Sequence, residues 1–224
     1  MRIELNDVTV DTRHGPILSG VTLVLAGGCR TVITGPASCG KSILHSVLQG
    51  LTRPTAGSMI VDDVPTSSMS ARNVRRYRAR LGVISQIPLF DHDLTVFENL
   101  LLAGAARAMR REAATAAALE ALADSGMSHR RSHRVDELSD AERTLVGIAR
   151  AMTGPTEMLL IDDAFVGLDE PTLRTALDMI LTTSSRREIG LVITTSDATL
   201  ADLVPGCDRH TMHEGRLSPM LEAA

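Results

Sequence analysis

The segment GPASCGKS, at residues 35–42, decides the fold because it is a glycine-containing loop between two different kinds of apolar pattern. Arg30–Thr34, just before it, is a short run rich in β-branched residues, which is typical of a buried strand. After it, apolar residues from Ile43 to Leu51 recur at helical spacing. A strand, a loop that ends in Gly-Lys-Ser and a helix together predict a site for nucleotide phosphates.

The residue types in this loop fit that chemistry. Backbone N–H groups of the loop and of the helix start point toward an anion, Lys41 offers a compact charge to the β- and γ-phosphate oxygens, and Ser42 offers a hydroxyl to Mg²⁺. Lys41 is the only lysine among 23 lysine and arginine residues, and the planar fork of an arginine would not fit this place. We expect ATP to contact nine residues, namely Gly35, Pro36, Ala37, Ser38, Cys39, Gly40, Lys41, Ser42 and Ile43.

Composition restricts the function classes. The chain has 224 residues, a net charge of -4 and no apolar run long enough to span a membrane. The acidic balance argues against nucleic acid as a partner, and the arginine run at residues 72–80 is interpreted as a solvated helix face rather than a phosphate-binding patch. Residues 1–5 alternate like an edge strand and lack the pattern of a signal peptide, so we expect a cytosolic protein.

Further along the chain, apolar runs at residues 157–162 and 190–195 predict buried parallel strands of a covered central sheet. Residues 96–127 are rich in alanine and leucine at helical spacing, which predicts an inserted helical lobe. No repeat and no linker composition divides the chain.

Several segments with characteristic residues follow the phosphate loop in a fixed order. They are PTAGSMIVD at residues 54–62, GVISQ at 82–86, DLTVFENL at 93–100, LSDAE at 138–142, IARAM at 148–152, MLLIDD at 158–163 and GLD at 167–169. In this order they resemble the ATP-binding cassette (ABC) family over nearly the whole chain. The resemblance implies an α/β fold, in which a P-loop NTPase core with a mixed, mainly parallel sheet carries an N-terminal antiparallel β portion and an inserted α-helical lobe.

The resemblance also implies domain bounds and residue roles. One domain would cover residues 1–224, with the core at 1–87 and 154–224 and the helical lobe at about 88–153. Asp162 would hold Mg²⁺ through water at the end of a strand. Gln86 would contact Mg²⁺ and relay to a transmembrane partner, Asp169 would lie in the D-loop, and Ser139 would reach the ATP of a second cassette across a head-to-tail dimer.

Two catalytic positions depart from the family pattern. Asp163 stands where the family has a glutamate that activates water, and it is one methylene shorter, so its reach as a general base is reduced. Ser196 stands where the family has a histidine, and a serine can donate a hydrogen bond but is never cationic. We therefore expect slow ATP hydrolysis.

The signature segment departs as well. Ser139 is kept, but Asp140, Ala141 and Glu142 replace two glycines and a glutamine of the family pattern. Ser-Asp-Ala-Glu is also a capping box, in which Ser139 and Glu142 would satisfy the helix's own N–H groups and two carboxylates would repel ATP. The adenine-stacking aromatic expected near Thr12 is missing, and His14 is the nearest possible substitute, although its favoured interpretation is a histidine of a surface loop.

Two functions stay open at this point. The first is an ATPase subunit that works with transmembrane transporter subunits and a second ABC subunit, identical or different, at the cytoplasmic face of the cell membrane. The second is a regulatory cassette that binds ATP without hydrolysing it and gates or scaffolds a membrane complex. A soluble cassette for DNA repair, translation or cluster assembly is disfavoured by the lack of a basic surface or coiled-coil insertion. A P-loop kinase would share only the first motif.

Overall fold

The computed structural model describes residues 1–13 and 15–220, and these divide into two compact units. The first unit comprises Met1–Arg78, Leu160–Asp163 and the chain from Gly190 onward, and the second comprises Ala79–Leu159 and Ala164–Ile189. Residues 79–87, 154–159 and 164–189, which we expected with the phosphate loop, cluster instead with the helices of the second unit. The single domain of the sequence analysis remains a prediction.

An antiparallel sheet forms the N-terminal part of the first unit. Its order is β2-β1-β4-β5, with bounds β1 Arg2–Thr12, β2 Gly15–Ala26, β4 Ala56–Val61 and β5 Val64–Pro65. This confirms the N-terminal antiparallel β portion. The expected edge position of the first strand is wrong, because β1 pairs with β2 on one side and with β4 on the other. Alternation reveals which face of a strand is buried, not how many neighbours it has.

A second sheet carries the phosphate loop. In the first unit its order is β10-β9-β3-β8, followed by the last residues of β7. The bounds are β3 Arg30–Thr34, β7 Met158–Asp162, β8 Gly190–Thr195, β9 Asp208–His213 and β10 Arg216–Pro219. β3 is parallel to both β8 and β9, with Thr34 opposite Thr195. Every residue of β8 is buried, as its continuous apolar run predicts.

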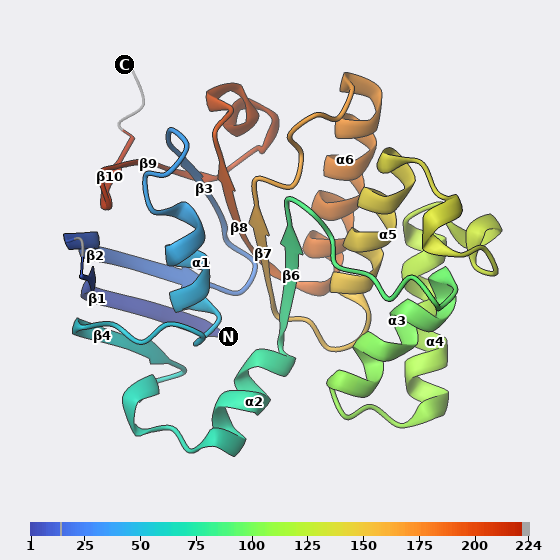
Figure 1. Cartoon of the computed structure of the whole chain (residues 1–224), viewed down its shortest axis with the longest axis horizontal. Coiled ribbons are helices and arrows are strands. Elements are labelled where there is room, and N and C mark those ends of the chain that lie inside the picture. The colour runs from blue at the N-terminus through green and yellow to red at the C-terminus, as the bar shows by residue number, and fades with distance from the viewer. Residues whose placement is uncertain (14, 221–224) are drawn as a thin grey trace. The chain divides into compact units, whose positions relative to one another are not determined.

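Helices dominate the second unit, where β6 (Leu81–Ser85) neighbours β7. Figure 1 shows the four long helices of this unit grouped together, with bounds α3 Val96–Ala106, α4 Arg111–Asp124, α5 Asp140–Met152 and α6 Glu170–Arg187. Val96, Leu100, Leu122 and Val146 are among the residues of an apolar core that α3, α4 and α5 share. The helices expected within residues 96–127 are confirmed.

The remaining elements are short and connect these parts. They are helix α1 Lys41–Leu48, helix α2 Ala71–Ala79, and the 3-10 turns η1 Thr66–Ser68, η2 Ser128–Arg130, η3 Val135–Glu137 and η4 Ala198–Leu203. Helix α1 buries Leu44, Val47 and Leu48, whereas Leu51, expected on its apolar face, lies beyond the helix end and is exposed. The helix ends earlier because Gly50 adopts a positive φ of 64°.

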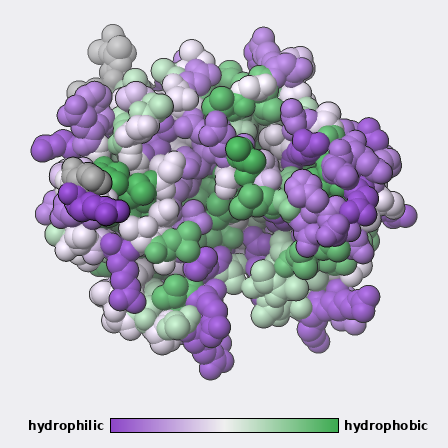
Figure 2. All heavy atoms as spheres, viewed as in Figure 1, coloured by the Kyte–Doolittle hydropathy of each residue, from purple (hydrophilic) through white to green (hydrophobic). Residues whose placement is uncertain are grey.

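The surface mixes polar and apolar side chains. Figure 2 shows hydrophilic residues over much of the visible face, with apolar residues between them. Ile87 and Leu89 are the large apolar side chains with the greatest exposure among the described residues, at 75% and 81%. None of the helices within residues 1–13 and 15–220 has the length and apolarity needed to cross a bilayer.

Candidate functional site

The functional side chains of the first unit gather where three strands end. The phosphate loop follows the end of β3, Asp162 is the last residue of β7, and Ser196 follows the end of β8. β8 lies between β3 and β7 in the sheet. Ligands of open α/β sheets bind outside the carboxyl ends of the strands, so this edge is the candidate site.

The phosphate loop has a backbone shape that suits an anion. Ser38 and Gly40 adopt positive φ angles of 63° and 112°, and Gly40 precedes α1 without a side-chain cap on the helix N-terminus. Such alternating conformations turn successive N–H groups to one side of the chain. A Cβ atom on Gly35 would lie 2.4 Å from the carbonyl oxygen of Met212, so only glycine fits there.

Lys41 is held inside the loop. Its side chain is 4% exposed, and its Nζ donates to the carbonyl oxygens of Gly35 at 2.8 Å and Pro36 at 3.0 Å. The same nitrogen lies 3.4 Å from Oδ2 of Asp163. The positive charge of the site is therefore fixed at the place where the negative phosphates are expected.

Asp163 and Ser196, the two residues that depart from the family pattern at catalytic positions, contact each other. Oδ1 of Asp163 accepts hydrogen bonds from the backbone N–H of Ser196 at 2.7 Å and from its hydroxyl at 3.2 Å. Asp163 also adopts a positive φ of 47°, and its backbone N–H donates to the carbonyl oxygen of Thr194 at 2.9 Å. Both carboxylate oxygens of Asp163 thus have partners, Ser196 on one and Lys41 on the other.

Asp162 has a different environment from its neighbour. Its Oδ1 accepts a hydrogen bond from the hydroxyl of Thr194 at 2.8 Å, and that hydroxyl lies 2.9 Å from Nε2 of His45. Burial lowers the pKa of His45, although the nearby carboxylates of Asp162 and Asp163 oppose this shift. The sequence analysis missed His45 and Thr194, because a histidine on a helix and a threonine in a buried strand carry no motif.

The residues of this edge fit Mg²⁺-ATP as a donor set. Gly35 and the positive φ angles shape a cradle of N–H groups, and Lys41 supplies the charge opposite the phosphates. Ser42 is exposed at the helix start, so its hydroxyl is available, and Asp162 supplies the carboxylate that Mg²⁺ prefers. Within the described ranges no cluster of three or more His, Cys, Asp or Glu residues forms a protein-only metal site. His14, the nearest possible substitute for the missing adenine-stacking aromatic, lies outside the described residues.

Three other expected site residues lie in the second unit. Gln86 directly follows β6 and is exposed. Asp169 caps the start of α6, where its Oδ1 accepts from the backbone N–H of Thr172 at 2.9 Å. Hydrogen bonds from Thr172 lower the pKa of Asp169. Ser139 caps the start of α5.

The capping box expected from the signature segment is present. The hydroxyl of Ser139 accepts from the backbone N–H of Glu142 at 3.3 Å, and Oε2 of Glu142 accepts from the backbone N–H of Ser139 at 2.9 Å. Arg130 donates to Oε1 of Glu142 at 2.7 Å. The bond from the Ser139 backbone, with that from Arg130, lowers the pKa of Glu142 to about 2. Ser139 is thus engaged within its own helix start.

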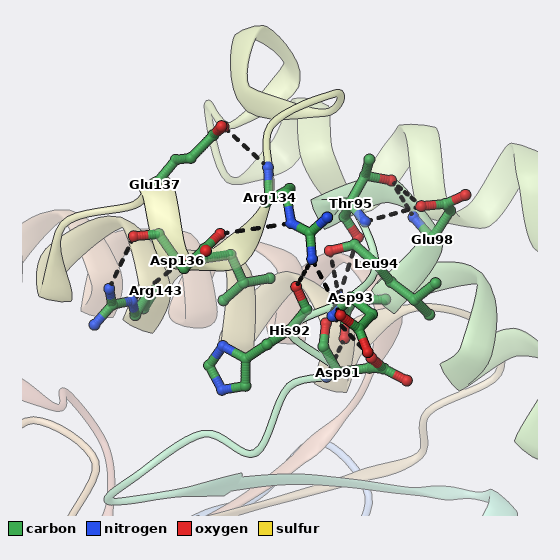
Figure 3. A network of polar contacts seen from close by, with 12 residues as sticks. Asp91, His92, Asp93, Leu94, Thr95, Glu98, Arg134, Asp136, Glu137 and Arg143 are labelled. Atoms are coloured by element: carbon green, nitrogen blue, oxygen red, sulfur yellow. Dashed lines mark hydrogen bonds and ion pairs between the residues drawn. The ribbon is translucent and has the colours of Figure 1, made fainter.

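A polar network ties the start of α3 to the turn before α5. Figure 3 shows Arg134 reaching across, where its Nη2 donates to the carbonyl oxygen of His92 at 2.9 Å and to Oδ1 of Asp93 at 3.2 Å. Thr95 and Glu98 form a second capping box at the start of α3. The network therefore anchors the segment that leads into the Ser139 capping box.

Comparisons with known proteins agree on one family. The family described as ABC transporter matches residues 18–166. The chain is 32% identical over 209 residues to a lipoprotein-releasing system ATP-binding protein, LolD, of Syntrophotalea carbinolica, covering 92% of this chain and 91% of that one. It is 33% identical over 204 residues to the methionine import ATP-binding protein MetN 2 of Lactiplantibacillus plantarum, covering 87% of this chain and 58% of that one.

Solved structures agree on the fold. A dimeric ATP-binding cassette in a post-hydrolysis state, bound to ADP and Pi, has a TM-score of 0.87 at 23% identity and covers 99% of each chain. CbiO1 of Clostridium perfringens, part of an ABC transporter complex, has a TM-score of 0.86 at 21% identity, covering 96% of this chain and 86% of that one. At these identities the likeness concerns the fold.

Proposed function

We propose, from the premise that this chain belongs to the ABC transporter family, that it is an ATP-binding subunit that hydrolyses ATP slowly and couples this to membrane partner subunits. The observation that carries the proposal is the meeting of the phosphate loop, Lys41 and Asp162 at the carboxyl ends of β3 and β7, the two strands on either side of β8. Motif residues that are far apart in the sequence need this arrangement to act on one nucleotide.

The geometry supports the proposed binding roles. The loop N–H groups and Lys41 hold the phosphates, which requires Lys41 to exchange the carbonyl oxygens of Gly35 and Pro36 for phosphate oxygens. Ser42 and Asp162 would hold Mg²⁺, the latter through water. When bound, Mg²⁺ neutralises charge on the phosphates during transfer.

Slow hydrolysis is supported by the partners of Asp163. A general base must reach the attacking water with a free oxygen, but Ser196 contacts Oδ1 and Lys41 lies 3.4 Å from Oδ2. When phosphates bind, Lys41 moves to them and releases Oδ2 of Asp163. The two hydrogen bonds from Ser196 remain, and they keep the short Asp163 carboxylate at the end of β8. Asp163 is therefore present as a general base, but it is poorly placed to accept a proton from the attacking water.

Assembly is expected with a second cassette and with membrane subunits at the cytoplasmic face. Ser139 would meet the second cassette's nucleotide, but Glu142 already occupies its hydroxyl. Ile87 and Leu89, next to Gln86, are exposed apolar side chains that suit an apolar partner.

The test measures Mg²⁺-ATP binding by calorimetry and phosphate release on the same purified sample. The wild type is compared with Lys41→Met, which keeps the length of the side chain but removes its charge. We expect the wild type to bind and to release phosphate slowly, and Lys41→Met to lose binding by about 10- to 100-fold. Equal binding by both proteins, or no binding by the wild type, contradicts the proposal.

A second function, a regulatory cassette that binds ATP without hydrolysis, is favoured by one observation. The Ser139–Glu142 capping box closes the surface that a second cassette's γ-phosphate would approach. ATP binding without phosphate release, even after Asp163→Glu with Ser196→His, would select this alternative.

A further inference from the structure

A chain of three polar side chains, of which His45 and Thr194 are buried and Asp162 is partly exposed, lies next to the phosphate loop. His45 of α1 is 2% exposed and Thr194 of β8 is 0% exposed. Nε2 of His45 lies 2.9 Å from Oγ1 of Thr194, which in turn lies 2.8 Å from Oδ1 of Asp162. The chain therefore leads from the helix after the phosphate loop to the carboxylate at the end of β7.

The direction of these hydrogen bonds follows from proton counting. An ionised carboxylate only accepts, so the hydroxyl proton of Thr194 is donated to Oδ1 of Asp162 at 2.8 Å, and the carbonyl oxygen of Ile161, at 3.4 Å, is only a weak second acceptor. The hydroxyl oxygen then accepts from His45, which requires the ring proton to be on Nε2.

The other ring nitrogen gives independent support. Nδ1 of His45 is buried and has no hydrogen-bond partner among the described residues. A proton there would be a buried donor without an acceptor, which folded proteins rarely tolerate. An unprotonated Nδ1, which is an acceptor without a donor, is tolerated better. The surroundings of Nδ1 and of Nε2 therefore indicate the same neutral tautomer, with the proton on Nε2.

We propose that His45, as the neutral Nε2–H tautomer, is a positioning residue that fixes the orientation of the Asp162 carboxylate through the hydroxyl of Thr194. This inference rests on the proposed function, in which Asp162 serves Mg²⁺. With Oδ1 engaged by Thr194, Oδ2 of Asp162 is the oxygen left to the metal's water shell. Partners of this outer kind orient metal-site carboxylates, and their loss weakens metal affinity by about 10- to 100-fold.

The first measurement needs no nucleotide. The ¹⁵N shifts and couplings of the histidine rings report their tautomers by NMR, and the His45 signals are identified by their loss in His45→Gln. We expect a protonated Nε2 and an unprotonated Nδ1 at neutral pH. A proton on Nδ1, or a doubly protonated ring, overturns the proposal.

The second measurement is the Mg²⁺ concentration that half-saturates Mg²⁺-dependent ATP binding. His45→Leu and Thr194→Val remove the chain at similar volume, and we expect each to raise this concentration by about tenfold and the double variant to raise it no further. Thr194→Ser keeps the hydroxyl, and His45→Gln places an amide donor near the position of Nε2, so both should stay within about threefold of the wild type.

The outcomes separate the inference from its premise. Variants that lose only thermal stability, with unchanged Mg²⁺ dependence, show that His45 merely packs and overturn the inference. If the wild type itself shows no Mg²⁺-dependent ATP binding, the proposed function fails and the role at Asp162 is overturned with it, whereas the NMR measurement still decides the tautomer.

Discussion

The ammonium nitrogen of Lys41 lies 3.4 Å from Oδ2 of Asp163, so without nucleotide the main positive charge of the site is paired with a carboxylate at its catalytic position. Phosphates must compete with that carboxylate for Lys41. They also meet its negative charge at short range, where like charges repel appreciably even at an effective dielectric constant of about 20. The pair therefore opposes ATP binding.

Removing this charge should strengthen nucleotide binding. We expect Asp163→Asn to bind ATP about tenfold more tightly, because one repulsive charge is lost, and to release phosphate more slowly than the wild type. Equilibrium titration with ATP checks the first effect and single-turnover phosphate release the second. Asp202→Asn, which removes an exposed carboxylate of the same unit, is the control and should change neither. Weaker ATP binding by Asp163→Asn would count against an opposing pair.

The two altered catalytic positions should act as one unit. Ser196 donates to Asp163 from its backbone and from its hydroxyl, so restoring the family residue at only one position disturbs this contact without building a complete site. We expect Asp163→Glu and Ser196→His to change phosphate release by less than about threefold each, and the double variant to raise it by about tenfold or more. A double-mutant cycle on the release rate is the measurement, and strictly additive effects would refute the coupling.

Acid should selectively weaken the capping box at α5. The pKa of Glu142 is lowered to about 2 from 4.5, so its ionised form adds stability that is complete above pH 4.5 and is lost as the pH falls toward 2. We expect Glu142→Gln to lower the free energy of unfolding at pH 7, and the gap to the wild type to narrow at pH 3.5. Urea unfolding at both pH values measures this.

Glu120→Gln is the matched control for that experiment, because its exposed ion pair with Arg186 is long, at 3.5 Å, and contributes little. A gap for Glu142→Gln that stays constant between the two pH values would mean that the carboxylate is not what holds the helix start.

Two glycines with the same φ separate backbone strain from steric contact. Gly28 and Gly57 both have a φ of 76°, but a Cβ at Gly28 meets nothing within 4 Å, whereas at Gly57 it lies 2.2 Å from the carbonyl oxygen of Asp7. We expect Gly28→Ala to lower the free energy of unfolding by about 1 kcal/mol and Gly57→Ala by about 2 kcal/mol more. Chemical denaturation checks this, and equal losses would rule out a steric role for the Asp7 contact.

Local sequence determined much of what this protein is. The strand, loop and helix around Lys41 and the capping box of Ser139 and Glu142 could be predicted because their parts interact with residues close by in the chain. The buried strands were predictable because a strand covered on both faces needs a continuous apolar run. The family followed from the order of such local segments.

Tertiary structure alone decided how distant residues combine. His45 and Thr194 are 149 residues apart, and Asp163 and Ser196 are 33 apart, yet each pair shares a hydrogen bond. The interior position of β1 also depends on tertiary structure, because β1 has a neighbour on each side only through its pairing with β2 and with β4. Sequence periodicity reports which face of an element is buried, whereas the partner across a contact depends on how the sheet brings its strand ends together.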